Sequence, residues 1–140
     1  MKIPDEVRKE VEIHAPRERV WAALTRPEEL VRWFPTHLAE IDLRPGGAAR
    51  FEWEDSSDEA LVDVVEPPGR LVFRWRPKGL DRPYTTVSFT LEESSVGTRL
   101  TLVESGFASL PDQIAQQSQE GNDAGWTDEL AELRAYLEAA

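Results

Sequence analysis

The clearest pattern of hydrophobic and polar positions lies near the end of the chain, in residues 125–140. Four apolar residues recur there at spacings of four, three and four, which places them on one side of a helix. They are Trp126, Leu130, Leu133 and Leu137. The other side is acidic and carries Asp128, Glu129, Glu132 and Glu138. The pattern predicts a long amphipathic C-terminal helix, with Asn122 or Asp123 as its N-terminal cap.

The middle of the chain has a different period. Between residues 38 and 106, apolar and polar residues alternate, which is typical of β-strands with one buried face. Turn sequences rich in proline and glycine, such as those at 45–47 and 67–69, separate the alternating stretches. An earlier alternating stretch at 7–13 predicts a first strand. We therefore expect about seven strands that together form one sheet.

Two short helices are predicted between the first strand and the rest of the sheet. Residues 17–24 have an apolar side, and residues 28–34 follow a capping pattern formed by Thr25 and Glu28. Residues 107–121 suit either a short helix or an extension of the C-terminal helix. This order of elements predicts a single α+β domain over residues 1–140, in which a sheet wraps around one long helix.

Five sequence motifs, in this order, carry a family resemblance. They are IHAPRERVWAALTRPEELVRWF at 13–34, IDLRPGG at 41–47, VVEPPGRLVFRW at 64–75, VSFTLEESSVGTRLTLVESGF at 87–107 and GW at 125–126. Together they resemble the activator of heat shock protein 90 ATPase homologue family, within the START-like (SRPBCC) superfamily. The resemblance implies a helix-grip fold, in which a curved antiparallel sheet with its first strand beside its last grips the C-terminal helix. It also implies a cavity between sheet and helix that takes up hydrophobic small molecules.

Aromatic residues are the main candidates for a binding site. The chain has five tryptophans, and all of them fall on predicted apolar faces. Such rings either fill the core or line a pocket between the sheet and the helix. We predict an apolar ligand site lined by Trp33, Phe34, Trp53, Phe73, Trp75, Phe89 and Trp126.

Glu104 is the most informative polar candidate, because it falls on the same strand phase as Leu100 and Leu102. A carboxylate buried without a partner is costly, and burial would raise its pKa. Glu104 is therefore a polar member of the ligand site if its strand is regular. Alternatively, a bulge before Gly106 turns it toward solvent, and the sequence leaves both arrangements open.

Metal and covalent chemistry find little support in the sequence. Its two histidines, His14 and His37, are 23 positions apart and form no metal-binding motif. We expect His14 to be exposed and His37 to lie near the mouth of the pocket. The chain has no cysteine and no serine-nucleophile motif. We therefore expect no metal and no cofactor.

Charge narrows the choice of partners. The chain carries 27 acidic and 16 basic residues, a net charge of −11, and an acidic surface repels nucleic acid and anionic lipid. The sequence has neither an apolar signal segment at its start nor a run of 18 apolar residues. We expect a cytoplasmic protein that binds neither nucleic acid nor membranes.

Three functions fit these features. The first is non-enzymatic binding of a small hydrophobic or aromatic molecule in the cavity. The second is a protein-interaction role, with a chaperone, a regulator or a second copy of the chain as partner. The third is an enzyme resembling the cyclases and dehydratases of related fold, with Glu104 or His37 as the only candidate acid or base.

Overall fold

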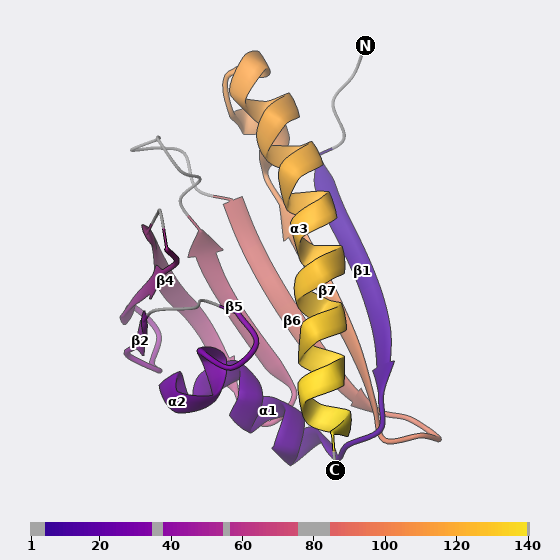
Figure 1. Ribbon diagram of the computed structural model, residues 1–140. Coiled ribbons are helices and arrows are strands. Elements are labelled where there is room, and N and C mark those ends of the chain that lie inside the picture. Colours follow the sequence, from indigo (N-terminus) through magenta and orange to yellow (C-terminus); the bar gives the residue numbers. More distant parts are fainter. Residues whose placement is uncertain (1–4, 35–37, 55–56, 76–84, 140) are drawn as a thin grey trace.

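The computed structural model describes residues 5–34, 38–54, 57–75 and 85–139 (Figure 1). Its strands are β1 (Glu6–Ile13), β2 (Leu38–Ile41), β3 (Ala48–Glu52), β4 (Ser57–Glu66), β5 (Arg70–Trp75), β6 (Thr85–Glu93) and β7 (Thr98–Ser105). Its helices are α1 (Arg17–Thr25), α2 (Pro27–Leu30), the short 3-10 helix η1 (Phe107–Ser109) and α3 (Asp112–Glu138). Within these ranges, no helix combines the length and the apolar character needed to cross a membrane.

All seven strands form one antiparallel sheet in the order β1-β7-β6-β5-β4-β3-β2. The first strand pairs with the last, so that Val7 lies opposite Glu104 and Ile13 opposite Thr98. Figure 1 shows α3 lying along one face of the sheet, with α1 and α2 at the end where α3 finishes. This is the helix-grip α+β fold that the sequence predicts.

The apolar stripe of α3 holds the helix against the sheet. Trp126, Leu130 and Leu133 are buried, and Leu137 is partly buried against the same core. Burying each of these large side chains contributes roughly 1.5–3 kcal/mol to stability. Because nearly all of this apolar surface faces the sheet, the stripe determines which side of α3 turns inward.

The helix is longer than its apolar stripe suggests. It begins at Asp112, directly after Pro111, so residues 112–121 extend the C-terminal helix. The prediction that Asn122 or Asp123 caps the helix is therefore wrong. Leu110 and Ala115 are buried, and this contact with the core explains why so polar a segment is helical.

The capping pattern at the second short helix is also not formed. Thr25 is still the last residue of α1, and its hydroxyl donates to the Trp21 carbonyl at 2.7 Å. Arg26 then takes the N-cap position of α2 without a side-chain cap bond. In the capping pattern the Thr25 oxygen would accept a backbone N–H of the next helix, whereas here the hydroxyl donates to a carbonyl of the preceding turn.

Candidate functional site

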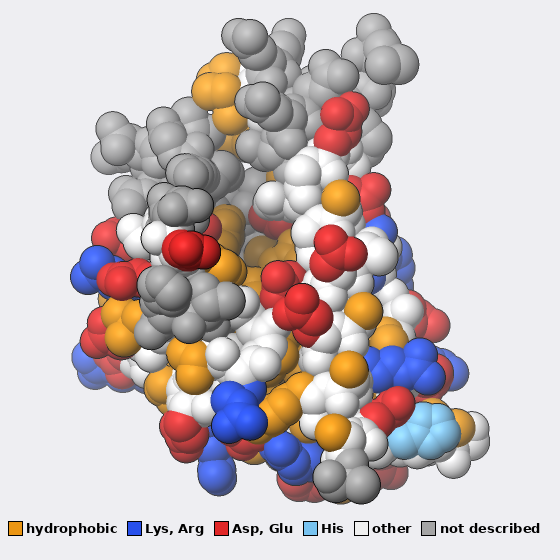
Figure 2. Space-filling model, viewed as in Figure 1, with side chains coloured by type: hydrophobic (Ala, Val, Ile, Leu, Met, Phe, Trp, Pro, Cys, Tyr) orange, Lys and Arg blue, Asp and Glu red, His pale blue; other side chains and the backbone are white. Residues whose placement is uncertain are grey.

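An aromatic pocket opens between α3 and the sheet. Its volume is about 220 Å³. The pocket is lined by Phe34, Trp53, Asp58, Trp75, Asn122, Gly125, Trp126 and Glu129. Figure 2 shows hydrophobic side chains at the floor of a hollow beside α3, with acidic side chains at its edge.

Phe34 lies at the centre of the rings that form the pocket. It stacks on Trp126, with ring centroids 5.5 Å apart, and meets Trp53 edge to face at 5.3 Å. Trp75 lies 6.1 Å from Phe34, measured between ring centroids. These rings come from α3, from the ends of β3 and β5, and from the turn after α2, so only the folded chain brings them together.

Four of the seven aromatic residues predicted for the site line the pocket, namely Phe34, Trp53, Trp75 and Trp126. The other three lie outside its lining and are buried in the core. Trp33 donates its indole N–H to the Ala23 carbonyl at 2.9 Å, which ties α1 to the end of α2. Phe73 and Phe89 contact each other within the sheet, and Phe89 also meets Trp126 edge to face at 5.9 Å.

Glu104 points inward and is 0% exposed. The pairing of β7 with β1 and with β6 runs without interruption through Glu104 to Ser105. The alternative of a bulge that turns Glu104 to solvent is therefore wrong. Its side chain lies behind the pocket, since it contacts Trp126 and Asn122 but does not itself line the cavity.

Four hydrogen bonds hold this carboxyl group. Trp126 donates its indole N–H to Oε1 at 2.9 Å, and Asn122 donates to Oε1 at 3.0 Å and to Oε2 at 3.1 Å. The Thr85 hydroxyl lies 2.5 Å from Oε2. A buried carboxyl group thus connects β6, β7 and α3 directly behind the pocket wall.

The environment of Glu104 favours the neutral carboxyl group. Burial raises its pKa, while the hydrogen bonds from Thr85, Trp126 and Asn122 act in the opposite direction. The Thr85 hydroxyl also lies 3.3 Å from the Trp75 carbonyl oxygen. If Glu104 is protonated, it can donate to the Thr85 hydroxyl while that hydroxyl donates to the Trp75 carbonyl, so each of these three groups has a partner.

Glu129 is one of four described pocket residues that the predicted site does not include. The sequence pattern places it on the acidic outer side of the helix, yet it lines the pocket and is only partly exposed. Its Oε2 atom is buried and has no hydrogen-bond partner among the described residues. Burial, with smaller contributions from Glu132 and Asp128, raises the pKa of Glu129 to about 7.

The positions of Asn122 and Glu129 relative to Trp126 in the sequence already indicate that they lie near the pocket. Asn122, Trp126 and Glu129 follow one another at four and three residues, which is the spacing of one helix face. Asn122 and Glu129 therefore had to lie near Trp126 wherever that ring was buried. Asp58 and Gly125 also line the pocket, and Asp58 carries no comparable signal because it comes from β4.

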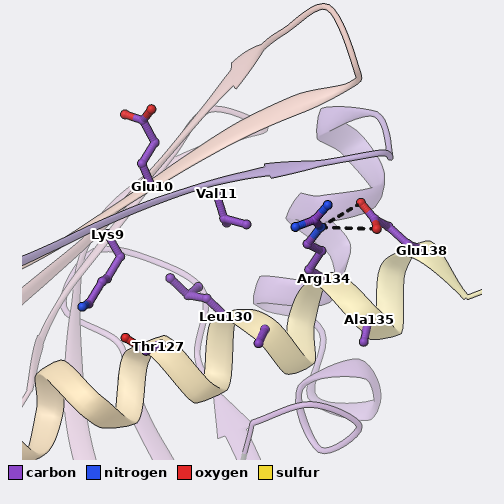
Figure 3. A pocket seen from close by; sticks show the side chains of 9 residues that line it. Lys9, Glu10, Val11, Thr127, Leu130, Arg134, Ala135 and Glu138 are labelled. Carbon is purple, nitrogen blue, oxygen red and sulfur yellow. Dashed lines mark hydrogen bonds and ion pairs between the residues drawn. The ribbon is translucent and has the colours of Figure 1, made fainter.

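A larger groove lies between β1 and α3, with a volume of about 480 Å³. In Figure 3, Lys9 and Val11 point from β1 toward the helix, whereas Glu10 points away. Arg134 pairs with Glu138 at 3.3 Å, and Lys9 pairs with Asp123. Because these charges are paired within the protein and the groove contains no aromatic ring, we take the smaller aromatic pocket as the candidate site.

The histidines and the acidic residues form no metal centre in the part of the chain that the structure describes. No group of three histidine, cysteine, aspartate or glutamate residues is placed there to hold a metal ion. His14 is exposed, as expected, and its backbone N–H donates to Glu138 at 2.9 Å. His37, which we expected near the pocket mouth, lies outside the described residues.

Comparison with known families agrees with this architecture. Residues 14–138 match the family model for Activator of Hsp90 ATPase homolog 1-like protein. The chain belongs to this family. The match covers most of the chain and confirms the resemblance carried by the five motifs. A comparison with curated proteins finds no match.

Solved structures of similar fold include MLL2253 from Mesorhizobium loti, which is 27% identical to this chain and has a TM-score of 0.84. The match covers 95% of this chain and 96% of MLL2253. DynU16, a protein in the dynemicin biosynthetic locus, is 32% identical with a TM-score of 0.78. That match covers 97% of this chain and 48% of DynU16, so the chain described here corresponds to about half the length of DynU16. The Aha1 dimer from Colwellia psychrerythraea shares the fold at 20% identity, with a TM-score of 0.79 over 95% of this chain and 96% of its own.

Proposed function

We propose that this protein binds a small hydrophobic or aromatic molecule between the sheet and α3, without catalysing a reaction on it. The observation that carries the proposal is the pocket lined by Phe34, Trp53, Trp75 and Trp126. Concave sites lined by aromatic side chains with a few polar groups are the usual form of small-molecule sites. Trp33, Phe73 and Phe89 serve as packing behind this pocket rather than as its lining.

The size of the pocket limits the ligand. Ligand pockets commonly have volumes of about 300–1,000 Å³, and this one measures about 220 Å³. We therefore expect a compact molecule, such as one with a single ring, that packs against the lining rings. Asn122 and Glu129 are the polar groups beside Trp126 that could orient it.

The hydrogen bonds behind the pocket support a pre-formed site. Glu104 holds the indole of Trp126 and the amide of Asn122, and both side chains line the cavity. A ring whose orientation is already held loses less conformational entropy when a ligand binds. In this proposal Glu104 is a positioning residue, because Trp126 and Asn122 lie between it and the cavity.

The acid that the sequence suggests for catalysis lies away from the cavity. A catalytic acid or base must come within hydrogen-bond distance of the reacting atom. Glu104, which the sequence suggested for this role, does not line the cavity. The similarity to DynU16, a protein in a biosynthetic locus, fits a role with small organic molecules and leaves a cyclase-like enzyme as the less favoured alternative.

The test is native mass spectrometry of the protein purified from its own host, followed by denaturing extraction of any retained molecule. We expect a stoichiometric apolar compound that is lost in Trp53→Ala, since Trp53 lies at the pocket and is only partly buried. Trp21→Ala is the matched control, because Trp21 is also partly buried but lies outside the pocket lining.

A titration of the purified protein with single-ring compounds, followed by tryptophan fluorescence, extends this test to weak ligands. Loss of one stacked ring should weaken binding roughly tenfold in Trp53→Ala. Equal binding by the Trp53 and Trp21 variants would contradict the proposed site.

A second candidate function is protein binding, including self-association. The sheet ends in β1 and β2, and an edge strand offers unpaired backbone groups to another chain. The similar Aha1 protein from Colwellia psychrerythraea is a dimer in solution, which supports the same possibility here. Light scattering after size-exclusion chromatography would test it, and a monomer at every concentration would exclude a homodimer.

A further inference from the structure

We propose that the pocket selects a ligand that carries a positively charged nitrogen, held by the aromatic faces and by the carboxylate of Glu129. This inference rests on the proposed function, because it names the chemical class of the molecule that the same pocket would bind. The expected ligand is an organic cation, such as an aryl or alkyl ammonium ion, rather than a neutral hydrocarbon.

The first argument is the combination of rings in one small space. Phe34, Trp53, Trp75 and Trp126 all line the pocket. The face of an aromatic ring carries partial negative charge, and pockets built from several such faces are a recurrent way to bind ammonium groups. Tryptophan, which contributes three of the four rings, is the strongest ring for this interaction.

The second argument is the charge at the pocket. Asp58 and Glu129 are acidic, and among the lining residues that the structure describes there is neither a lysine nor an arginine. Asp128 and Glu132, the neighbours of Glu129 on α3, add to the negative potential. An anionic ligand would be repelled there, and a cationic one would be attracted.

The third argument is that Glu129 lacks a partner. Its Oε2 atom is buried without a hydrogen bond in the described part of the structure. A partly buried carboxylate without a partner charge is destabilised, and a cation bound in the pocket would offset this cost through electrostatic attraction. Glu129 therefore has the properties of a group that completes its interactions only when the ligand is present.

The hydrogen bonds of the other buried carboxyl group, Glu104, are consistent with this role of Glu129. Glu104, the carboxyl group behind Trp126, already has bonds from Trp126, Asn122 and Thr85. It therefore does not compete for the cation. Glu129 lines the pocket, is only partly exposed, and has one carboxylate oxygen without a hydrogen-bond partner among the described residues.

The experiment compares two probes of nearly the same shape. Phenyltrimethylammonium carries the charge, and tert-butylbenzene replaces its nitrogen by carbon. Binding of each would be measured at pH 8 and low salt by tryptophan fluorescence and calorimetry. We expect the cation to bind the wild-type protein roughly tenfold more tightly than the hydrocarbon.

Two variants assign the selectivity to one carboxylate. Glu129→Gln removes the electrostatic attraction and should weaken binding of the cation roughly tenfold, while binding of tert-butylbenzene should stay unchanged. Glu132→Gln removes an acidic side chain from the same helix but outside the pocket lining, so its effect should be much smaller. Thermal unfolding of each variant would establish that both remain folded.

The outcomes separate this inference from the proposed function. If tert-butylbenzene binds as tightly as the cation or more tightly, the inference is wrong while the pocket remains a ligand site. An unchanged preference in Glu129→Gln would also overturn the assignment to Glu129. If neither probe binds, the inference fails together with the proposed function.

Discussion

The two sides of the space between the sheet and α3 are built from different side chains. On the side of β1 and β7 the core is aliphatic, with buried Val7, Ile13, Leu100, Leu102, Leu130 and Leu133. On the side of β3 and β5 it is aromatic, with Phe34, Phe51, Trp53, Phe73 and Trp75 in mutual ring contact. The pocket lies on the aromatic side.

Aliphatic and aromatic side chains pack in different ways because their shapes differ. Leucine, isoleucine and valine are small and adapt to one another, so they fill a core to nearly crystalline density. Large planar rings keep preferred contact geometries with their neighbours, and they give this pocket an aromatic lining, whereas the larger groove between β1 and α3 has aliphatic and charged side chains. We infer that the aliphatic side mainly stabilises the grip, whereas the aromatic side provides the binding site.

The largest effect is expected from a large-to-small substitution on the aliphatic side. Leu133 is 0% exposed, so Leu133→Ala should lower the free energy of unfolding by about 2–5 kcal/mol. Denaturant unfolding would measure this loss, and ligand preference should not change. Leu137→Ala, at a partly buried position on the same helix, should cost less. An altered ligand preference in Leu133→Ala would contradict the inference that the aliphatic side serves stability and the aromatic side serves binding.

An intermediate effect is expected at Glu104, which joins the two sides. Glu104→Ala leaves the N–H groups of Trp126 and Asn122 without their acceptor, and should cost about 1–3 kcal/mol of unfolding free energy. Glu104→Gln should be nearly neutral, because the amide oxygen can accept from Trp126 and Asn122 and the amide N–H₂ can donate to the Thr85 hydroxyl.

Chemical denaturation of both Glu104 variants at pH 7 would check this prediction. A Gln variant as unstable as the Ala variant would indicate that Glu104 is ionised rather than neutral. The core would then contain a buried charge directly behind the aromatic pocket.

The last effect on stability is expected at Glu129 and depends on pH. Its pKa is raised from 4.5 to about 7 in the folded protein, so the folded state holds a proton more tightly than the unfolded state. This contribution to stability is complete below pH 4.5 and is lost as the pH rises through about 7. Glu129→Gln should therefore show a smaller fall in stability between pH 5 and pH 8 than the wild-type protein.

Thermal melts across this pH range, with Glu132→Gln as the control, would measure the difference. Asp58 from β4 and Asp128 and Glu132 from α3 are the other acidic groups near Glu129. An identical pH profile for the wild-type and Glu129→Gln proteins would show that Glu129 is not desolvated at the pocket.

Much of the fold was predictable from local patterns. The alternation over residues 7–13 identified β1, and the apolar spacing after residue 125 identified the buried face of α3. The helix start was missed, because its first turns are stabilised by contacts of Leu110 and Ala115 rather than by their own apolar pattern. The candidate site was less predictable, since Trp33, Phe73 and Phe89 have the same alternation as the rings that line the pocket.

The sequence by itself determined which residues turn inward, because side-chain period and backbone geometry are local properties of a helix or a strand. It also determined the family, through motifs spread along the chain. Which of the inward-facing rings line a cavity, and which are buried in the core, depends on how β3, β5 and α3 pack against one another. This can be seen only in the tertiary structure. For the same reason, the burial of Glu104 and the unpaired oxygen of Glu129 became visible only when elements distant in sequence were placed side by side.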